Sequence, residues 1–533
     1  MHRILLTLPA LVAIANAVDS CQPQAPSVHT ITYTTTTTLY REKPCATPPS
    51  ATKLPSITTQ PQPSKPHSSS EPDVECTADP KVESVFGSAP VKSHTLSPGS
   101  SGSWSNTTTN STDIPTRAQT SLASATSQLQ PQSTGNLGRY PVAGNTTKGL
   151  KNALYFTNWG IYARNYLPSM IPVDKITHLL YAFAGVDANG TVISIDPWAD
   201  EQKQLNDTSS MPGSNVYGCV KEIYLHKKKH RNLKTLLSIG GWTASDKGAF
   251  NFAASDTGRR QFARSAVSLM SDWGMDGLDV DWEYPKNAEE AQQYVQLLEA
   301  CRKELDDFAT KHRQKYHYLL TVASSAGPNT YNVMDLKGMD RFLDAWNLMA
   351  YDYAGDWSDN TGHLANLHPN SNNPNSTVFS TAKAVGDYLA AGISPHKLII
   401  GLPLYGRSFE MTLGLGKKFH GVGPGKFEKG VWPYNMLPKT GATVELDDAA
   451  GAAWSYDAGT KELISHEDPR TVLIKSDYIK DNGLGGAFWW EASGDKTGDE
   501  SLVGAMAKSF GTLEFSENML DYPSSRFDNI RRG

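Results

Sequence analysis

The chain has 533 residues, with 49 basic and 54 acidic side chains and a formal net charge of −5 at pH 7. So small a charge on so long a chain argues against a basic surface of the kind that binds nucleic acid. The chain is too long to fold around one ordinary hydrophobic core, and its composition changes sharply near residue 148. We therefore expect an N-terminal tail followed by one large domain.

The first 17 residues have the pattern of a secretory signal peptide. A start that contains His2 and Arg3 precedes an apolar run over residues 4–15 and the small-residue triplet 15–17. This order is typical of a leader that is cleaved on export, here near Val18. No later stretch reaches the roughly 18 to 20 consecutive apolar residues that a membrane span needs. We expect a secreted, extracellular protein with no membrane partner, either free or associated with the cell wall.

The region 18–147 is rich in Ser, Thr, Pro and Gln and includes a run of threonines at 34–38. It lacks the apolar periodicity with which a chain buries a core, so we expect a disordered, glycosylated stalk. The alternative is a small carbohydrate-binding module, which would need clustered aromatic side chains where this region has scattered ones. Sequons for N-glycosylation begin at Asn106, Asn110, Asn145, Asn189, Asn206 and Asn375.

The five cysteines are an odd number for an exported chain, so at least one thiol has no partner within a monomer. Cys21, Cys45 and Cys76 lie in the stalk region, whereas Cys219 and Cys301 lie in the main domain. Their pairing stays open. Cys301 falls on the apolar stripe of a helix-period segment, which favours a buried, unreactive thiol over a nucleophile or a metal ligand.

From residue 148 onward, short apolar runs alternate with helix-period segments such as 288–311. Continuous apolar strands are typical of a parallel sheet that is buried on both faces. Eight such runs predict an α/β fold, a (β/α)8 TIM barrel over 148–513, followed by a polar C-terminal tail at 514–533. The expected strands are 153–156, 176–183, 233–239, 277–282, 318–323, 345–349, 398–402 and 485–490.

The interval after the seventh expected strand is longer than one helix needs. Residues 406–480 are rich in Gly, Pro and aromatic side chains and carry β-strand patterns. We expect a small α+β insertion there, beside the mouth of the barrel.

Three acids, Asp279, Asp281 and Glu283, alternate along the fourth expected strand. Side chains on a strand repeat every two residues, so all three point the same way, which inside a barrel is toward its interior. Buried like charges are costly and raise one another's pKa, so one of them can stay protonated near neutral pH. Glu283, nearest the mouth, is the expected proton donor. A solvated acidic turn or a calcium site fits less well, because calcium ligands usually come from a flexible loop.

Together with Asp276, these acids form the pattern DxxDxDxE, which resembles the signature of glycoside hydrolase family 18 chitinases. The segments 238–242, 349–352 and 401–407 resemble that family's SxGG, sixth-strand and seventh-strand motifs, and Trp490 resembles its floor tryptophan. The resemblance covers about residues 148–510 and points to the secreted fungal type with an insertion domain.

The resemblance implies hydrolysis, endo or exo, of the β-1,4 links between N-acetylglucosamine units of chitin or chitooligosaccharides. In this family the acetamido carbonyl of the substrate is the nucleophile. Glu283 would protonate the leaving oxygen, and Asp281 would hold the acetamido N–H. Asp279 would tune Asp281, and Tyr351 would donate to the acetamido oxygen. Asp276 is expected to be mainly structural.

The same resemblance implies a set of substrate-binding residues. Several are aromatic side chains at or just beyond the ends of expected strands, where rings can stack on sugar faces. Core packing explains Phe183 or Trp159 equally well, and Trp282 is expected to be structural because it alternates away from the acids. The implied set is Tyr155, Phe183, Gly240, Gly241, Trp242, Thr243, Tyr284, Met349, Asp352, Tyr405, Arg407 and Trp490.

Two other functions stay open on the sequence. A chitin-binding lectin on the same barrel would typically lack the terminal acid, whereas Glu283 is present. An endo-acting hydrolase of N-linked glycans shares the acid signature but needs a different cleft. No HExxH-like pattern, clustered histidines or phosphate-binding glycine spacing occurs, so we expect neither a metal nor a cofactor. We also expect a monomer.

Overall fold

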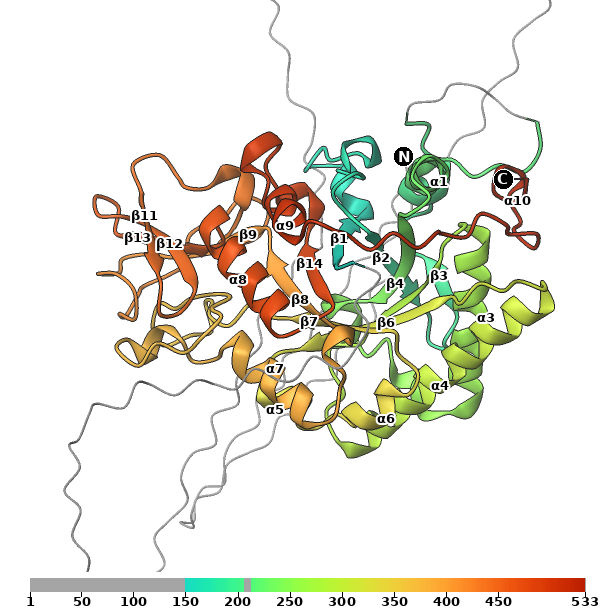
Figure 1. Ribbon diagram of the computed structural model, residues 1–533, viewed down its shortest axis with the longest axis horizontal. Helices are drawn as coiled ribbons and strands as arrows, with labels where there is room; N and C mark the ends of the chain where they lie inside the picture. The colour runs from blue at the N-terminus through green and yellow to red at the C-terminus, as the bar shows by residue number, and fades with distance from the viewer. Residues whose placement is uncertain (1–148, 206–211, 533) are drawn as a thin grey trace, which may run out of the picture. The chain divides into compact units, whose positions relative to one another are not determined.

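The structure is a computed structural model that describes residues 149–205 and 212–532 (Figure 1). The expected signal peptide (1–17) and stalk (18–147) lie outside the described residues, as do Cys21, Cys45 and Cys76. Among the helices that the structure describes, none combines the length and the apolar character needed to cross a membrane.

Eight parallel strands close into a ring, which confirms the predicted (β/α)8 barrel (Figure 1). The ring is complete because β1 pairs with both β2 and β14. A short strand, β3 (Val192–Ser194), pairs antiparallel with the end of β2. The barrel strands are β1 (Lys151–Thr157), β2 (His178–Val186), β4 (Lys234–Gly240), β5 (Gly277–Asp281), β6 (Leu319–Ser325), β7 (Ala345–Met349), β8 (Leu398–Pro403) and β14 (Gly486–Trp490).

Helices follow the strands around the barrel. The longest, α4 (Ala288–Lys311), has the bounds that its apolar periodicity predicts, and it begins where Asn287 Oδ1 accepts a hydrogen bond from Glu290 N at 2.9 Å. Cys301 is buried on α4 as expected, and Cys219 is buried too; within the described part of the chain neither forms a disulfide. The other helices are α1 (Gly218–Lys229), α2 (Trp242–Asp246), α3 (Asp256–Asp272), α5 (Pro328–Tyr331), α6 (Leu336–Asp340), α7 (Thr381–Ala390), α8 (Pro469–Asp481), α9 (Leu502–Phe510) and α10 (Asp528–Arg531).

The barrel strands are buried on both faces. Every residue of β4 and of β5 is buried. Outward-facing side chains join the large apolar cluster under the helices, and a second cluster, which includes Tyr155, Leu180 and Phe488, fills the interior. A charged side chain among these apolar neighbours is costly unless hydrogen bonds or a proton compensate its burial.

The interval after β8 holds a five-stranded antiparallel sheet followed by helix α8, the strands and helix expected over 406–480. In the structure, α8 follows the sheet directly, begins at the capping side chain of Asp468 and packs against α9, so it belongs to the ring of barrel helices. The expected range, 406–480, joined the sheet to this helix because no linker separates them in the sequence. In sheet order the strands are β10 (Val431–Pro433), β9 (Tyr405–Phe409), β13 (Glu462–His466), β12 (Ala452–Asp457) and β11 (Thr443–Asp447).

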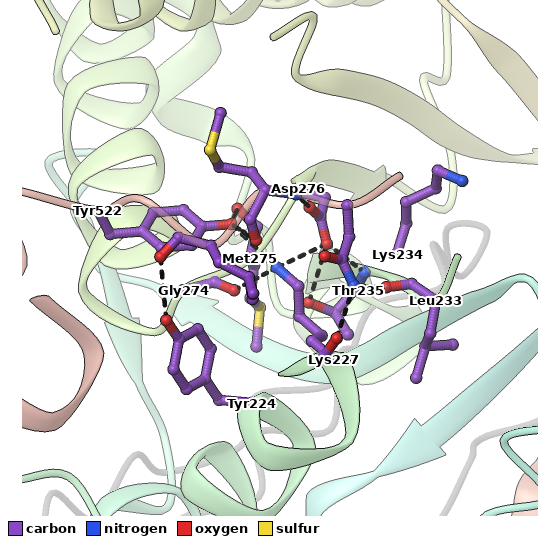
Figure 2. Close-up of polar contacts among 12 residues, drawn as sticks. Tyr224, Lys227, Leu233, Lys234, Thr235, Gly274, Met275, Asp276 and Tyr522 are labelled. Carbon is purple, nitrogen blue, oxygen red and sulfur yellow. Dashed lines mark hydrogen bonds and ion pairs between the residues drawn. The ribbon is translucent and has the colours of Figure 1, made fainter. Parts of the chain in front are cut away.

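The C-terminal segment 514–532, expected to be a polar tail, packs against the residues that lead into the barrel strands. Its Tyr522 is fully buried. Lys227 Nζ lies 2.8 Å from Asp276 Oδ2 and donates to Tyr522 Oη at 2.9 Å (Figure 2). Asp276 Oδ1 also accepts from Met519 N at 2.8 Å. The apolar side chains of this segment follow no helix or strand period, which is why the sequence predicts a polar tail here.

Candidate active site

A cleft of about 1510 Å³ lies at the carboxyl ends of the barrel strands. In this fold, sites are built at that end by the loops that follow the strands. Asp279 is buried beneath the cleft. The other predicted site residues all line it: Tyr155, Phe183, Gly240, Gly241, Trp242, Thr243, Asp281, Glu283, Tyr284, Met349, Tyr351, Asp352, Tyr405, Arg407 and Trp490.

Asp279 accepts four hydrogen bonds, each from a different barrel strand. Its Oδ2 accepts from Tyr155 Oη at 2.8 Å and from Ser238 Oγ at 2.7 Å. Its Oδ1 accepts from Thr321 Oγ1 at 2.7 Å and from Asn347 Nδ2 at 3.0 Å. Burial raises the pKa of Asp279, and the four hydrogen bonds oppose the rise because they favour the charged carboxylate. This carboxyl group is therefore fixed in place.

Asp281 lies two residues further along β5, in different surroundings. Its side chain is buried, and its Oδ1 has no hydrogen-bond partner within the described part of the chain. Burial raises the pKa of Asp281 well above its usual range, and the charges of Glu283 and Asp279 raise it further. The site therefore favours the protonated form of Asp281 and leaves one of its oxygens available to a ligand.

Glu283 follows β5 and is partly exposed in the cleft. Burial raises the pKa of Glu283 to about 7, and the charge of Asp352 contributes to the rise. Hydrogen bonds with Tyr284 and with the backbone of Trp242 oppose it. The backbone N of Glu283 donates to Ser245 Oγ at 3.0 Å. A carboxyl group with a pKa near the working pH can both give and take a proton, as a general acid–base catalyst must.

The turn after β4 requires glycine at two positions. Gly240 and Gly241 have φ angles of 115° and 84°, which residues with a Cβ rarely adopt. A Cβ on Gly240 would lie 2.4 Å from the carbonyl oxygen of Asp281, and one on Gly241 would lie 2.7 Å from the ring of Phe183. Gly241 N donates to the same carbonyl oxygen at 2.9 Å. The turn thus holds Trp242, the first residue of α2, against the strand that carries the acids.

Trp490 packs with other rings in the cleft. Its ring centroid lies 5.3 Å from that of Tyr155 and 5.7 Å from that of Phe183. Trp159, which also lines the cleft, lies 6.0 Å from Phe183. Rings held at such distances are rigid and present apolar faces, which suits stacking on a sugar ring.

Tyr351 follows β7 and lies beside two other rings, with centroid distances of 6.3 Å to Tyr405 and 6.0 Å to Phe488. Burial raises the pKa of Tyr351 well above its usual range, and the charges of Glu283 and Asp281 raise it further. Its hydroxyl group therefore stays protonated and can donate a hydrogen bond to a ligand in the cleft.

Asp352 is the shared hydrogen-bond acceptor in a polar part of the cleft. Its backbone has a left-handed conformation, with φ of 59°. It accepts hydrogen bonds from Tyr405 Oη at 2.6 Å and from Nε and Nη2 of Arg407 at 2.6 and 2.8 Å. Such bidentate hydrogen bonding between an arginine and a carboxylate has a defined geometry. The Arg407 guanidinium lies 4.7 Å from the ring centroid of Trp357, a cleft residue that the sequence analysis missed.

Three further cleft residues that the sequence analysis did not predict come from segments that are distant in the sequence. Arg164 pairs with Glu491 at 3.3 Å, and its guanidinium lies 4.5 Å from the ring centroid of Phe427 in the insertion. All three line the cleft. Their positions depend on contacts between the loops after β1, β14 and β9, so no local pattern predicts them.

Two residues of the acidic motif region lie away from the cleft, as expected. Trp282 is buried and stacks on Phe250 with ring centroids 5.0 Å apart. Asp276 forms the buried ion pair with Lys227 and accepts a hydrogen bond from Thr235 N at 2.8 Å (Figure 2). Within residues 149–205 and 212–532, no group of three His, Cys, Asp or Glu side chains is placed to hold a metal ion.

Residues 151–495 match the family model described as "Glycosyl hydrolases family 18". The chain belongs to glycosyl hydrolase family 18. This family 18 chain is 49% identical over 387 residues to "Chitinase 1" of Aphanocladium album, a match that covers 72% of the chain and 91% of that protein. It is 50% identical over 393 residues to "Endochitinase 1" of Metarhizium robertsii, covering 73% of the chain and 92% of that protein.

Solved structures resemble the family 18 chain as well. Chitinase ChiA74 from Bacillus thuringiensis has a TM-score of 0.63 and 29% identity, over 70% of this chain and 71% of that one. A mutant GH18 chitinase from Cycas revoluta in complex with (GlcNAc)4 has a TM-score of 0.57 and 25% identity, over 68% of this chain and 100% of that one. The family resemblance read from the acidic motif is confirmed.

Proposed function

We propose that this family 18 enzyme hydrolyses the β-1,4 linkages between N-acetylglucosamine units of chitin and chitooligosaccharides, with retention of configuration. The observation that carries the proposal is a pair of acids in the cleft: Glu283, whose pKa burial raises to about 7, and the buried Asp281 two residues before it. Relatives that are 49% and 50% identical are named chitinase and endochitinase, which supports the substrate class.

Glu283 supplies the proton for bond cleavage. Its proton passes to the glycosidic oxygen as the bond between that oxygen and C1 breaks, and the carbonyl oxygen of the substrate's acetamido group attacks C1. The products of this step are an oxazolinium ion and the departing sugar. The Glu283 carboxylate then takes a proton from a water molecule, whose oxygen opens the oxazolinium ring at C1. C1 is inverted twice, so the product keeps the β configuration.

Asp281 and Tyr351 hold the acetamido group during the attack. Oδ1 of Asp281, which has no partner within the described residues, accepts the acetamido N–H, and this hydrogen bond orients the acetamido oxygen toward C1. The Tyr351 hydroxyl donates to the acetamido oxygen. Asp279, fixed by its four donors, acts through Asp281 by raising the pKa of that residue. Trp490 offers a flat apolar face to the sugar that carries C1.

The two other functions are less well supported. A chitin-binding lectin has no need of an acid whose pKa is raised to about 7 in its cleft, yet Glu283 has this property. A hydrolase of N-linked glycans would share Glu283 and Asp281, so the substrate itself must separate it from a chitinase.

The test compares two substrates under the same conditions: the soluble N-acetylglucosamine hexamer, and a glycoprotein with N-linked glycans. We expect shorter oligomers from the hexamer, released first as the β anomer in NMR spectra, and an intact glycoprotein. A thiazoline analogue of the oxazolinium ion should compete with the hexamer. Glycan release without hexamer cleavage, or an α-anomeric first product, would contradict the proposal.

We also propose that the chain is exported and acts outside the cell as a monomer. The signal-peptide pattern at 1–17 supports export, as does the exposure of Asn189 and Asn375, which begin sequons. Protein collected from the culture medium should start near Val18 and sediment with the mass of one chain. Retention in cells with Met1 in place would contradict export, and a dimer mass would contradict the monomer.

A further inference from the structure

Ser245, in α2, forms hydrogen bonds with the backbone of both acids of the cleft. Its Oγ accepts a hydrogen bond from the backbone N of Glu283 at 3.0 Å and donates to the carbonyl oxygen of Asp281 at 3.5 Å. Ser245 is buried and lies outside the set of residues that line the cleft. It therefore contacts the chain that carries the acids from behind, without reaching a ligand.

The contact matters because β5 ends at Asp281. Up to that residue the backbone is held by pairing with β4, and Tyr294 Oη donates to the carbonyl oxygen of Val280 at 2.9 Å. Glu283 lies beyond the last paired residue, and its backbone N donates to a side chain instead. The position of Glu283 therefore depends on α2 as well as on the sheet.

α2 also holds Glu283 through its carboxyl group. This group forms a hydrogen bond with the backbone of Trp242, the first residue of α2. Ser245 follows three residues later in the same short helix, so α2 binds Glu283 at two points, the backbone N and the carboxyl group. Two contacts from one segment fix both the place and the direction of a catalytic side chain.

The turn that contains α2 is itself fixed against β5. Ser245 N donates to the carbonyl oxygen of Gly241 at 3.0 Å, and Gly241 N donates to that of Asp281 at 2.9 Å. Phe250, which follows α2, stacks on Trp282 with ring centroids 5.0 Å apart. The turn thus packs against the chain between the two acids by hydrogen bonds and by an aromatic contact.

We propose that Ser245 is a positioning residue for catalysis, which acts through Glu283 by holding the proton donor where its carboxyl group reaches the glycosidic oxygen. This inference rests on the proposed function. The leaving oxygen that Glu283 protonates and the acetamido group held at Asp281 belong to the same sugar, so the two acids need a defined separation. A misplacement of about 1 Å can cost on the order of 100-fold in rate.

The same contact affects the acid strength of Glu283. Burial raises the pKa of Glu283 to about 7, and the hydrogen bond with the backbone of Trp242 is one of the contacts that oppose the rise. Loss of the Ser245 contact lets Glu283 move away from Trp242, so its pKa should rise further. The ionisable side chains that interact with Glu283 are Asp281, Tyr284, Tyr351 and Asp352.

The experiment compares Ser245→Ala with the wild type, both as the full chain. The matched control is Ser525→Ala in the C-terminal segment. Ser525 is buried as well, donates to the carbonyl oxygen of Asp272 at 2.9 Å and accepts from Phe527 N at 3.2 Å. A further variant, Ser245→Thr, keeps the hydroxyl group. For each protein, kcat and KM for the soluble N-acetylglucosamine tetramer are measured across the pH range, together with the melting temperature.

We expect Ser245→Ala to lose at least about tenfold in kcat while KM stays within about twofold of the wild-type value. The alkaline limit of its kcat/KM should move to higher pH, because Glu283 keeps its proton longer. Ser525→Ala should lower the melting temperature by a similar amount but keep the wild-type kcat and pH profile, and Ser245→Thr should keep most of kcat. If Ser245→Ala does not fold, Ser245→Cys takes its place, because a thiol has a similar shape and is a weaker acceptor.

A wild-type kcat and pH profile in Ser245→Ala would overturn the positioning role. So would a loss of kcat that Ser525→Ala shares, because that loss would follow from lower stability alone. Wild-type protein that leaves the tetramer intact would instead contradict the proposed function.

Discussion

Asp279 and Asp281 lie two residues apart on β5, yet Asp279 accepts four hydrogen bonds whereas the buried Oδ1 of Asp281 has no donor among residues 149–205 and 212–532. The first carboxyl group is therefore fixed by the fold. The second keeps an oxygen for a ligand, and burial together with the charges of Glu283 and Asp279 raises its pKa. The charge of Asp279 is thus one of the causes of the raised pKa of Asp281, after burial and the charge of Glu283.

Asp279→Asn should shift the pH dependence of catalysis. The substitution removes one of the charges that raise the pKa of Asp281, so Asp281 should titrate at lower pH and the pH profile of kcat should shift in the same direction. Ser238→Ala is the matched control, because it removes one of the four donors and leaves the charge. A kcat profile for Asp279→Asn that superimposes on the wild-type profile would show that Asp279 does not act through Asp281.

The pKa of Glu283 predicts an alkaline limit to activity. Burial raises this pKa to about 7, and a general acid acts only while it carries its proton. As the pH rises through 7 the proton is lost, so kcat/KM should fall above that pH, approaching a tenfold decrease per pH unit. Measurement on a soluble oligosaccharide from pH 4 to 9 checks this, and a constant kcat/KM up to pH 9 would contradict the assignment.

The same group links stability to pH. The folded-state pKa of Glu283 is raised from 4.5 to about 7, so between these values the folded protein binds more protons at this site than the unfolded protein does. The contribution of Glu283 to the free energy of unfolding therefore falls as the pH rises from 4.5 to 7. Glu283→Gln should lack this fall, as urea denaturation at several pH values would show. Parallel pH dependences in the two proteins would refute the linkage.

Asp276, although part of the acidic motif, should matter for stability rather than for chemistry. Asp276→Asn leaves the ammonium group of Lys227 buried without its counter-charge, a change that typically costs about 3 to 5 kcal/mol. The double variant Lys227→Met/Asp276→Asn should recover part of the loss. In both variants kcat at low temperature should stay near the wild-type value. A loss of kcat at unchanged stability would place Asp276 in the catalytic machinery instead.

The barrel domain should work without the expected stalk. A chain that begins at Asn145 retains every residue that lines the cleft, because these lie between Tyr155 and Gly494. Its kcat/KM on a soluble oligosaccharide and its melting temperature should equal those of the full chain. An aggregated or inactive shorter chain would mean that the stalk region contributes to the folded domain.

The barrel and the acids could be predicted because both depend on local patterns. Apolar runs separated by helix-period segments indicate a parallel barrel, and the two-residue repeat of a strand puts Asp279, Asp281 and Glu283 on one face. The helix α4 has strong periodicity and a capping Asn287, so even its bounds were predicted correctly.

The features that the sequence did not reveal depend on contacts between distant segments. Lys227 and Asp276 are separated by an entire βα unit, and Tyr522 reaches them from the C-terminus. The sequence did not reveal that α8 belongs to the ring of barrel helices rather than to the sheet, because α8 follows β13 without a linker. Arg164 and Phe427 meet only once the insertion stands beside the loop after β1. Neither residue type nor spacing carries such information.

The central claim, that Glu283 is the proton donor, is tested most directly by Glu283→Gln. The amide keeps the shape of the side chain but removes the acidic proton, so hydrolysis of the N-acetylglucosamine hexamer should fall by at least about 100-fold, as expected for the loss of a general acid. Hexamer binding, measured by calorimetry on the same protein, should keep its wild-type Kd. Turnover near the wild-type rate would contradict the account, because another group would then have to supply the proton.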